Sequence, residues 1–478
     1  MKRAVVVSVV LVFHSLAVHA EFKAGFARVD MTPPIGTEVD GYFRKRVSDG
    51  ILDPLEINAV AFSDGTNKAV VVSADVVTLR AYFELYRKKA AESAGLPPDA
   101  IFIACTHTHT GPVVCKSFYG ESYDSFDKAS TYELFLGERL ADAVKLSLAD
   151  LAPAKLSIGR GEARNISFIR RFRMKDGTCR TNPGRGNPDI VAPVGMPDET
   201  VQLVRIDREG RDAIALVNFQ CHPDTIGGNK ISADWPGVVR RTVERALDGV
   251  KCIFVNGAQG DSNHVCVDVS RKEIPRGLDV VYRHMGRVVA GAAIGIWDAC
   301  VPVPAGKVGF GVALAKVKAN RAAPEEIPEA QRIVDLYNSG KVSEIPGTGM
   351  QRNTNIVAAQ RKLHLKDGPD YFHFPLSAVT VGDSLASVGF PGEPFTAYGT
   401  ALKEKSPFTM TIPACLVNGY FGYLPTDAAL SEKSGYETQG SIFVPGLEQA
   451  IVNGHLEQLD RLLKSGRPGE EQMKGDRK

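Results

Sequence analysis

Two histidines separated by a single threonine could hold a metal ion. His107 and His109 follow the apolar residues 100–103 and lie in a segment, residues 106–112, that ends in Gly-Pro. In an extended backbone, side chains two residues apart point in the same direction, so both imidazoles are expected to face one pocket. Imidazole is the commonest metal ligand in proteins, and two hydrogen-bonded structural histidines are the alternative interpretation of this segment alone.

A third histidine and a carboxylate occur in comparable positions further along the chain. His222 ends a short apolar strand before a proline turn, and Glu393 lies in a glycine-bounded turn, residues 389–396, that follows another expected strand. Taken alone, Glu393 fits an acid at the start of a helix at least as well. Tyr420 and Tyr423 lie in a glycine-rich turn, where stacking and packing are their ordinary role.

The segments that must position these side chains show alternating strand and helix patterns. A hairpin is expected within residues 59–73, where an Asp-Gly pair separates two apolar runs. Helical periodicity is expected at residues 82–94, which Gly95 ends, and at residues 131–148. Further expected strands comprise residues 24–31, 201–206, 213–219, 252–255, 308–317, 378–381 and 385–388.

This alternation predicts an α/β fold in which a mixed β-sheet core is flanked by helices. No repeat or Pro/Gly/Ser-rich linker divides the chain, so residues 21–465 are expected to form a single large domain. The mostly polar residues 324–360 have an interrupted helical pattern, and we expect them to lie over the site. Residues 288–296 are too few to span a bilayer and predict a buried helix.

The two ends of the chain indicate export and disorder. Residues 1–20 contain a basic start, an apolar run and small residues at the cleavage positions, which predict a cleavable signal peptide and a secreted or periplasmic protein. The charged residues 466–478 are expected to be a disordered tail. Loss of Lys2 and Arg3 takes Lys+Arg from 57 to 55 against 55 Asp+Glu, a balance that argues against nucleic acid as a partner.

The cysteines are too few to form a disulfide scaffold. The chain has eight, and an exported protein could pair some of them. Cys105 and Cys221 lie near the histidines described above, but Cys221 is adjacent to His222 and would point to the opposite face of a strand. Thiolate ligation of a metal is therefore the less favoured alternative.

Four motifs in a fixed order carry a resemblance to a known family. They are Thr-His-Thr-His-Thr-Gly-Pro at 106–112, His-Pro at 222–223, Pro-Gly-Glu at 391–393 and Tyr-x-x-Tyr-x-x-Thr at 420–426. In this combination the chain resembles the neutral/alkaline, non-lysosomal ceramidases, which are zinc-dependent amide hydrolases that release a fatty acid from a sphingoid base. The resemblance extends from about residue 25 to residue 463.

The resemblance implies that His107, His222, Glu393 and Tyr423 are zinc ligands. Two imidazoles and a carboxylate are a common catalytic set that leaves a position on Zn²⁺ open for water, whose pKa the metal can lower to roughly 7. A tyrosine ligand is less usual, because it must lose or share a proton with an unperturbed pKa of about 10.

The same resemblance implies further functional residues around the metal. His109 would hold or transfer the proton of the zinc-activated water, and Asp75 would orient one imidazole. Arg170, or its neighbour Arg171, matches the pocket arginine of the family. Tyr436 matches a tyrosine that would donate a hydrogen bond to the developing oxyanion.

The chain departs from the family pattern at residues 260–264. Ceramidases have Gly-Asp-x-Ser-Pro-Asn there, and their serine is assigned a catalytic role. Here an ungapped match places Asn263 at the serine position, and Ser262 is a catalytic candidate only with one residue deleted. The chain also stops soon after Leu463, where family members usually continue into an immunoglobulin-like domain. We therefore favour zinc-activated water over Ser262 as the nucleophile.

Together these features predict a secreted zinc-dependent hydrolase, built on a single catalytic domain, that cleaves the amide bond of an N-acyl lipid such as ceramide. A small-molecule or lipid amide is the expected substrate, and no transmembrane segment is expected. Two alternatives stay open. One is a zinc-dependent esterase or phosphoesterase acting on another small substrate, and the other is a non-catalytic binding protein of the same fold.

Overall fold

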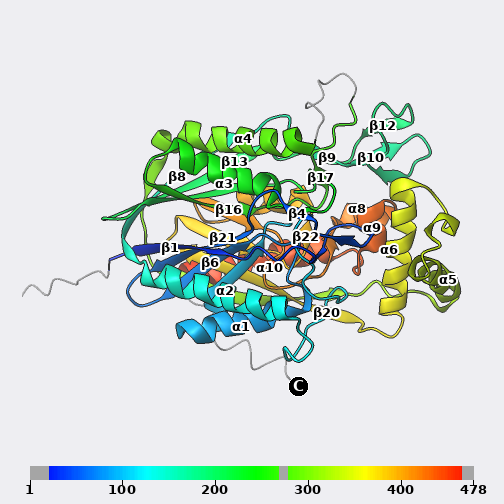
Figure 1. Ribbon diagram of the computed structural model, residues 1–478, viewed down its shortest axis with the longest axis horizontal. Helices are drawn as coiled ribbons and strands as arrows, with labels where there is room; N and C mark the ends of the chain where they lie inside the picture. The colour runs from blue at the N-terminus through cyan, green and yellow to red at the C-terminus, as the bar shows by residue number, and fades with distance from the viewer. Residues whose placement is uncertain (1–20, 269–277, 466–478) are drawn as a thin grey trace, which may run out of the picture.

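A large mixed sheet supplies most of the framework. The computed structural model describes residues 21–268 and 278–465, and nine of its strands form this sheet (Figure 1). In order across the sheet the strands are β16 (Val250–Asn256), β14 (Ala213–Phe219), β13 (Thr200–Arg208), β8 (Ala152–Glu162), β1 (Lys23–Asp30), β5 (Glu56–Ser63), β6 (Lys68–Ala74) and β7 (Ile101–Cys105), and β18 (Val301–Val303) pairs with β8. The pairs β14–β16 and β6–β7 are parallel, and the others are antiparallel.

A second, four-stranded sheet packs against one face of the large sheet. Its strands are, in order, β19 (Val308–Lys318), β20 (Tyr371–Val381), β21 (Leu385–Gly389) and β23 (Met410–Ala414), of which β21 and β23 are parallel. Successive side chains of a strand point to opposite faces. In β5, Val60 and Phe62 therefore pack with Val379 between the two sheets, whereas Ile57 and Ala59 face helices on the other side.

Helices cover the outer faces of both sheets and complete a four-layer α/β/β/α arrangement (Figure 1). The large sheet is covered by α1 (Phe83–Ala94) and α2 (Thr131–Ala149) on one half and by α3 (Asp234–Ala246) and α4 (Leu278–Ile296) on the other. The small sheet is covered by α7 (Thr396–Lys405) and α10 (Leu447–Ser465). Local signals fix the helix ends: Ser130 and Glu133 form a capping box at α2, and Gly95 ends α1 with φ of 64°.

Short elements connect and decorate these layers. The short strands are β2 (Glu38–Val39), β3 (Arg46–Val47), β4 (Gly50–Ile51), β9 (Phe168–Ile169), β10 (Arg171–Met174), β11 (Cys179–Thr181), β12 (Ile190–Pro193), β15 (Lys230–Ile231), β17 (Ser262–Asn263), β22 (Glu393–Pro394) and β24 (Tyr423–Leu424). The remaining helices are α5 (Ile327–Asn338), α6 (Gly349–Leu365), α8 (Asp427–Glu432) and α9 (Tyr436–Gly440). Helices α5 and α6 pack together beside the sheets, away from the four helices α1 to α4 (Figure 1).

The predicted fold class is confirmed, because a mixed sheet core is flanked by helices. The predicted strand at residues 213–219 coincides with β14, and the predicted hairpin is the antiparallel pair β5–β6. The expected buried helix at residues 288–296 is part of α4, where Val289, Ala290 and Ala293 are buried. The division of the core into two sheets was not predicted.

Other predictions concern the ends of the chain and its cysteines. The predicted signal peptide, residues 1–20, and the predicted tail, residues 466–478, lie outside the described residues. Within the described ranges, no helix is both long and apolar enough to cross a bilayer. All eight cysteines are described and are free thiols, so the disulfide pairing considered above is not present.

Candidate metal centre and its cavity

The predicted ligands meet where strands from both sheets end. His107 follows β7, His222 follows β14, and Glu393 follows β21. Each of these strands has a parallel neighbour, and parallel strands need crossover connections that leave long loops at their carboxyl ends. In α/β proteins such loops are the usual location of binding sites.

Asn256, the last residue of β16, holds these loops together. Its Nδ2 donates to the carbonyl oxygens of Thr106 at 3.0 Å and Cys221 at 3.3 Å, each the residue before a predicted histidine ligand. Its own carbonyl accepts from the N–H of Cys415, which follows the small sheet's last strand, at 3.0 Å. One buried asparagine, through its side chain and its main chain, therefore fixes the relative positions of three strand ends.

His107 lies in a strained turn after the strand, which ends at Cys105. Its φ is 70°, a left-handed conformation that costs a non-glycine residue on the order of 1 kcal/mol or more. The backbone N–H donates to Val76 at 2.9 Å, and Nδ1 lies 2.9 Å from the carbonyl oxygen of Val77. Because a carbonyl only accepts, Nδ1 carries the hydrogen and Nε2 is left with a lone pair.

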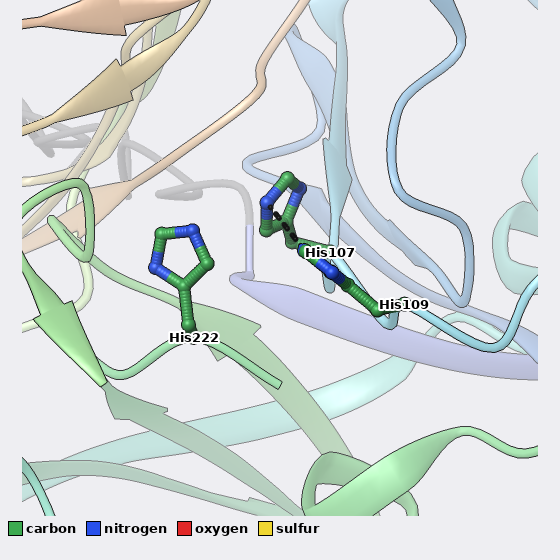
Figure 2. A group of neighbouring side chains, drawn as sticks. All are labelled: His107, His109 and His222. Atoms are coloured by element: carbon green, nitrogen blue, oxygen red, sulfur yellow. Dashed lines mark hydrogen bonds between the residues drawn. The ribbon is translucent and has the colours of Figure 1, made fainter. Parts of the chain in front are cut away.

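His109 lies on the same side of the chain as His107, as predicted, although the backbone between them is not extended. The two Nε2 atoms are 3.2 Å apart. The hydroxyls of Thr108 and Thr110 instead bind the carbonyl oxygen of Ser232, at 2.7 and 2.9 Å. Figure 2 shows the imidazoles of His107 and His109 beside each other and opposite His222.

His222 is oriented in the same way as His107, by main-chain oxygen atoms. Its Nδ1 lies 2.9 Å from the carbonyl oxygen of Gln259 and 3.1 Å from that of Ser262. Both oxygens belong to the loop after β16, and both can only accept. His222 therefore also presents an unprotonated Nε2, which is the atom that binds metals when Nδ1–H is held by a carbonyl.

Glu393 completes a tight group of three potential ligands. Its Oε2 lies 3.2 Å from His107 Nε2 and 3.1 Å from His222 Nε2. Despite these short distances, His222 Nε2 and Glu393 Oε2 are buried without a hydrogen-bond partner of adequate geometry. Donor atoms bound to one tetrahedral zinc at about 2.0–2.2 Å lie roughly 3.4 Å apart. The residues present therefore fit a metal ion, which would satisfy the buried lone pairs.

Tyr423 is in register with this carboxylate. The short parallel strands β22 and β24 pair Glu393 with Tyr423, and the tyrosine ring stacks on His222 with 6.3 Å between ring centroids. Burial, followed by the charge of Glu393, raises the pKa of Tyr423 well above its usual range, whereas Arg170 lowers it. A metal cation beside the phenol would, like Arg170, lower the pKa of Tyr423.

The charge states of the group follow from burial and from the carboxylate. Burial, and then His107, lower the pKa of His109 to about 3, so this imidazole is neutral. Burial opposes the ionisation of Glu393, but His107 and His222 hold its pKa well below the usual range. Burial lowers the pKa of His107, yet Glu393 outweighs it and raises the pKa overall.

His109 competes with Glu393 for the place of third ligand. Candidate ligand atoms of His107, His109 and His222 lie within 4.8 Å of one another. The ring centroids of His109 and His222 are 5.8 Å apart, compared with 5.0 Å for His107 and His222. Because Glu393 Oε2 is within 3.2 Å of both other ligands, the geometry favours Glu393 and leaves His109 beside the group.

Arg170 and Tyr436 both contact the ring of Tyr423. The Arg170 guanidinium is buried 5.3 Å from the centroid of the Tyr423 ring, and its Nε donates to Glu437 at 2.7 Å. Tyr436 contacts Tyr423 with 5.5 Å between ring centroids. Arg171 lies over Phe395 instead, so of the two neighbouring arginines Arg170 is the one beside the predicted ligands.

Asp75 does not orient an imidazole, contrary to the prediction. Its carboxylate accepts from both Nη atoms of Arg240, at 3.0 and 2.6 Å, and from Thr106 Oγ1 at 3.1 Å. The hydrogens on the Nδ1 atoms of His107 and His222 are bound by carbonyl oxygens, so no donor is left for Asp75. Asp75 belongs to a buried ion pair that supports the end of β6.

Replacing Asp75 with asparagine should lower the free energy of unfolding by about 3 kcal/mol, because a buried arginine loses one of its charged partners. Zinc content should not change, since Asp75 contacts none of the predicted ligands. Denaturant unfolding and metal analysis measure the two effects. Asp176→Asn, which breaks an exposed pair with Arg180, is the matched control and should change stability little. Zinc loss with unchanged stability would restore the orienting role.

Ser262 approaches the site through its backbone. Its carbonyl oxygen accepts from His222, whereas its buried hydroxyl lies 3.5 Å from the carbonyl oxygen of Gln259 and does not line the cavity. Asn263 also points elsewhere, with its Nδ2 3.3 Å from Asn182 Oδ1. A Cβ on Gly260 would collide with the main-chain carbonyl of Glu393, so the loop must approach the Glu393 backbone closely. The loop thus positions two ligands, and its serine hydroxyl is not aimed at them.

A cavity of about 1200 Å³ opens onto the ligands. His107, His109, Glu393, Tyr423 and Tyr436 all line it. Helices α5 and α6 contribute further lining residues, which confirms that the segment predicted to lie over the site does so: Tyr337, Asn338, Asn353, Ile356, Gln360 and His364. Tyr337 also fastens this segment to the cavity rim, since its hydroxyl donates to the Phe43 carbonyl at 2.7 Å.

Several residues that build the site were missed by sequence reasoning. The carbonyl oxygens of Val77 and Gln259, which orient the imidazoles, act through backbone and leave no side-chain signal. Asn256 is a polar residue at the end of an apolar strand, which is a signal that could have found it. Gly41 packs against the His109 ring with φ of 104°. Its position in an Asp-Gly-Tyr sequence, which is typical of a turn, could also have indicated it.

Fold and site together define a protein with a metal-compatible cluster of side chains at a large cavity. No protein-family model matches the chain, and no curated protein matches its sequence. Solved structures do match. The crystal structure of neutral ceramidase from Pseudomonas aeruginosa aligns with a TM-score of 0.68 at 18% identity, over 94% of this chain and 76% of that chain.

A structure of a ceramidase complexed with C2 aligns similarly, with a TM-score of 0.67 at 17% identity, over 94% of this chain and 76% of that chain. At this level of identity the likeness establishes the fold. The chain therefore has the neutral ceramidase fold, and the resemblance predicted from the sequence motifs is confirmed at that level.

Proposed function

We propose that the chain is a zinc-dependent amide hydrolase that cleaves an N-acyl lipid such as ceramide into a fatty acid and a sphingoid base. The observation that carries this proposal is the convergence of His107 Nε2 and His222 Nε2 on Glu393 Oε2, at 3.2 and 3.1 Å. Both neighbours of the same fold are ceramidases, which supports amide chemistry on a lipid substrate.

Four residues would hold the zinc ion: His107, His222, Glu393 and Tyr423. Bound there, zinc would act as a Lewis acid and lower the pKa of a coordinated water to roughly 7. The carbonyl oxygens that hold both Nδ1 atoms keep the imidazoles in the ligating tautomer before any metal arrives. Little reorganisation of the protein is then needed on binding.

Three further residues would assist the reaction. His109 Nε2, 3.2 Å from His107 Nε2, lies where it can take a proton from the attacking water and pass it to the leaving nitrogen. Tyr436 lines the cavity and would donate its hydroxyl hydrogen to the developing oxyanion. Arg170, held by Glu437 and stacked over Tyr423, would keep the phenol oriented.

Part of the cavity wall suits a substrate with an apolar chain. Phe43, Phe118, Val342 and Ile356 line the cavity together with the tyrosines. Its volume of about 1200 Å³ exceeds the usual range of about 300–1,000 Å³ for small-molecule sites. An acyl or alkyl chain lying along these residues would exclude water from the amide bond, which strengthens the hydrogen bonds that act on it.

The two arginines beside Tyr420 and Tyr423 give no support to a phosphate ester as the substrate. Arg80 and Arg170, which lie over Tyr420 and Tyr423, are each paired with a carboxylate, Asp40 and Glu437 respectively. A phosphoryl group needs cations that are free to compensate its charge. A carboxylic ester remains the competing substrate class, because an ester carbonyl needs the same nucleophile and the same oxyanion stabilisation as an amide carbonyl.

We also propose that residues 1–20 are removed as a signal peptide on export and that residues 21–465 form the catalytic domain. The basic start and apolar run of the first segment support export. Protein collected from the periplasm or the culture medium should have an N-terminal sequence that begins at Glu21. An unprocessed N-terminus would contradict this assignment.

Purified, zinc-loaded protein should hydrolyse a short-chain fluorescent ceramide, and chelation should abolish the activity until zinc is restored. Release of the fatty acid is the measurement. Ester and phosphate substrates with the same apolar chain serve as matched comparisons. Cleavage of the ester alone would support the esterase alternative, and zinc binding without turnover of any substrate would support a binding protein.

A further inference from the structure

Asp261 joins the two segments that carry His222 and Glu393, and its side chain has no part in the proposed reaction. The residue is only 4% exposed. Its Oδ1 accepts from the N–H of Thr396 at 2.7 Å and from Thr396 Oγ1 at 2.8 Å. Thr396 is the first residue of α7 and lies three positions after Glu393. The carboxylate therefore ties the loop after β16 to the helix that follows the proposed carboxylate ligand.

The loop on one side of this contact is the one that orients His222. Asp261 lies between Gln259 and Ser262, whose carbonyl oxygens are 2.9 and 3.1 Å from His222 Nδ1. The N–H of Ser262 also donates to the Gln259 carbonyl at 3.1 Å, so both oxygens belong to one tight turn. A displacement of this turn would move both oxygens, and the hydrogen on Nδ1 would lose the acceptors that hold it.

On the other side of the contact, Asp261 caps α7 from a distant part of the chain. The first N–H groups of a helix have no partner inside the helix, and the residue before it usually supplies an acceptor. Phe395 precedes α7 and makes no such side-chain bond. Asp261, 135 positions before Thr396, supplies the acceptor, and its negative charge suits the positive end of the helix dipole. The cap thus fixes where α7 begins relative to the loop.

Main-chain contacts hold the same loop independently of this side chain. The Gly260 N–H donates to the Pro394 carbonyl at 2.7 Å, and the Arg170 N–H donates to the Asp261 carbonyl at 2.9 Å. Replacing the side chain of Asp261 leaves both contacts in place, so the loop should stay folded without the carboxylate. The contribution of the carboxylate can therefore be measured separately from the fold of the loop.

We propose that Asp261 is a positioning residue of the metal centre, which sets the separation of His222 Nε2 and Glu393 Oε2 by capping α7 from the loop after β16. The inference rests on the ligand assignment of the proposed function and not on its substrate. The two ligand atoms lie 3.1 Å apart, close to the roughly 3.4 Å between donors on one tetrahedral zinc. Asp261 acts on both ligands through the main chain that carries them.

The first test compares the zinc affinity of the wild-type protein with that of three variants, by competition with a coloured chelator. Asp261→Ala removes the acceptor and should weaken zinc binding roughly 10- to 100-fold, the usual cost of losing an outer residue of a metal site. Asp261→Asn keeps an oxygen that can accept from both groups of Thr396, and its affinity should stay close to that of the wild type. Thr396→Val keeps the N–H but loses the hydroxyl, so its affinity should fall between the two.

Glu133→Ala is the matched control. Glu133 is 7% exposed, and its carboxylate also joins a loop to the start of a helix, because it accepts from the N–H groups of Cys115 and Ser130, both at 2.6 Å. Its replacement should lower the midpoint of denaturant unfolding and leave zinc affinity unchanged. An equal loss of zinc affinity in Glu133→Ala and Asp261→Ala would trace the effect to general stability and would overturn the inference.

The second test reads the orientation of His222 in the metal-free protein. Nitrogen NMR of histidine-labelled protein reports which ring nitrogen carries the hydrogen, and His222→Ala identifies the signals of this residue. The wild type and Asp261→Asn should show the Nδ1–H tautomer alone, whereas Asp261→Ala should show a mixture of tautomers. A fixed Nδ1–H tautomer or an unchanged zinc affinity in Asp261→Ala would overturn the inference and leave the ligand assignment standing. A wild-type protein that binds no zinc would refute the ligand assignment and the inference together.

Discussion

Replacing His222 with alanine should release the zinc ion and lower the rate of amide hydrolysis roughly 10³-fold or more. A Lewis acid contributes several kcal/mol of transition-state stabilisation, and each 1.36 kcal/mol corresponds to a factor of ten in rate. His222 is held by two carbonyl oxygens of one loop, so its replacement removes an Nε2 that is already oriented toward Glu393. Metal analysis of the purified wild type should find about one zinc per chain, and the variant should contain none.

His455→Ala is the matched control for loss of a buried imidazole. His455 is fully buried in α10, packs against Phe390 and does not line the cavity. Its removal should lower stability while zinc stays bound. Glu393→Gln keeps the shape of the carboxylate but removes its charge and should weaken zinc binding. Full zinc occupancy in His222→Ala would refute the ligand assignment, and unchanged affinity in Glu393→Gln would refute the carboxylate ligand.

The fold was predictable where a local pattern determines the element. The apolar run at residues 213–219 and the Asp-Gly turn between β5 and β6 give unambiguous signals, and the structure follows them. The division into two sheets was not predictable, because both faces of most strands are covered and the sequence shows no alternation of polar and apolar residues. In β5, for example, Val60 and Ala59 face different layers, yet both are buried and apolar.

The candidate site, like the fold, was predictable from the sequence only in part. His107, His109 and Glu393 could be found because their residue types and spacing are unusual at strand ends, and the structure brings them together. The role predicted for Asp75 failed because its partner, Arg240, is 165 positions away in sequence and leaves no local signal. The oxygens that orient the imidazoles belong to the backbone and could not be predicted from side-chain types.

The positive φ of His107 illustrates why the prediction succeeded without the correct local geometry. We expected an extended strand to direct His107 and His109 to one side, whereas β7 ends at Cys105 and a strained turn does so. The spacing of two residues correctly predicted that both imidazoles lie on one side, but an extended backbone is not the reason for it. The turn is held by hydrogen bonds to residues 76 and 77, at the end of the neighbouring parallel strand, and these depend on the tertiary fold.

His109→Ala should lower the rate of amide hydrolysis by roughly 10²- to 10⁴-fold while zinc remains bound, as expected for a positioned acid or base. Its Nε2 lies 3.2 Å from His107 Nε2, the same distance as Glu393 Oε2, but Glu393 Oε2 also lies 3.1 Å from His222 Nε2 and is therefore the better third ligand. Zinc content and rate are measured on the same preparation. Loss of zinc from His109→Ala would instead make His109 a ligand and favour the three-histidine arrangement.

Ser262→Ala is the comparison that completes this experiment, because it tests the other candidate for the attacking group. The Ser262 hydroxyl faces the Gln259 carbonyl and does not line the cavity, whereas its carbonyl oxygen, which holds His222, is retained in alanine. The variant should therefore keep its zinc and most of its activity. If Ser262 were the nucleophile, its removal would cost several powers of ten, and an acyl group on Ser262 would be detected by mass spectrometry. A large loss in His109→Ala beside a small loss in Ser262→Ala would leave water as the nucleophile, activated next to His109.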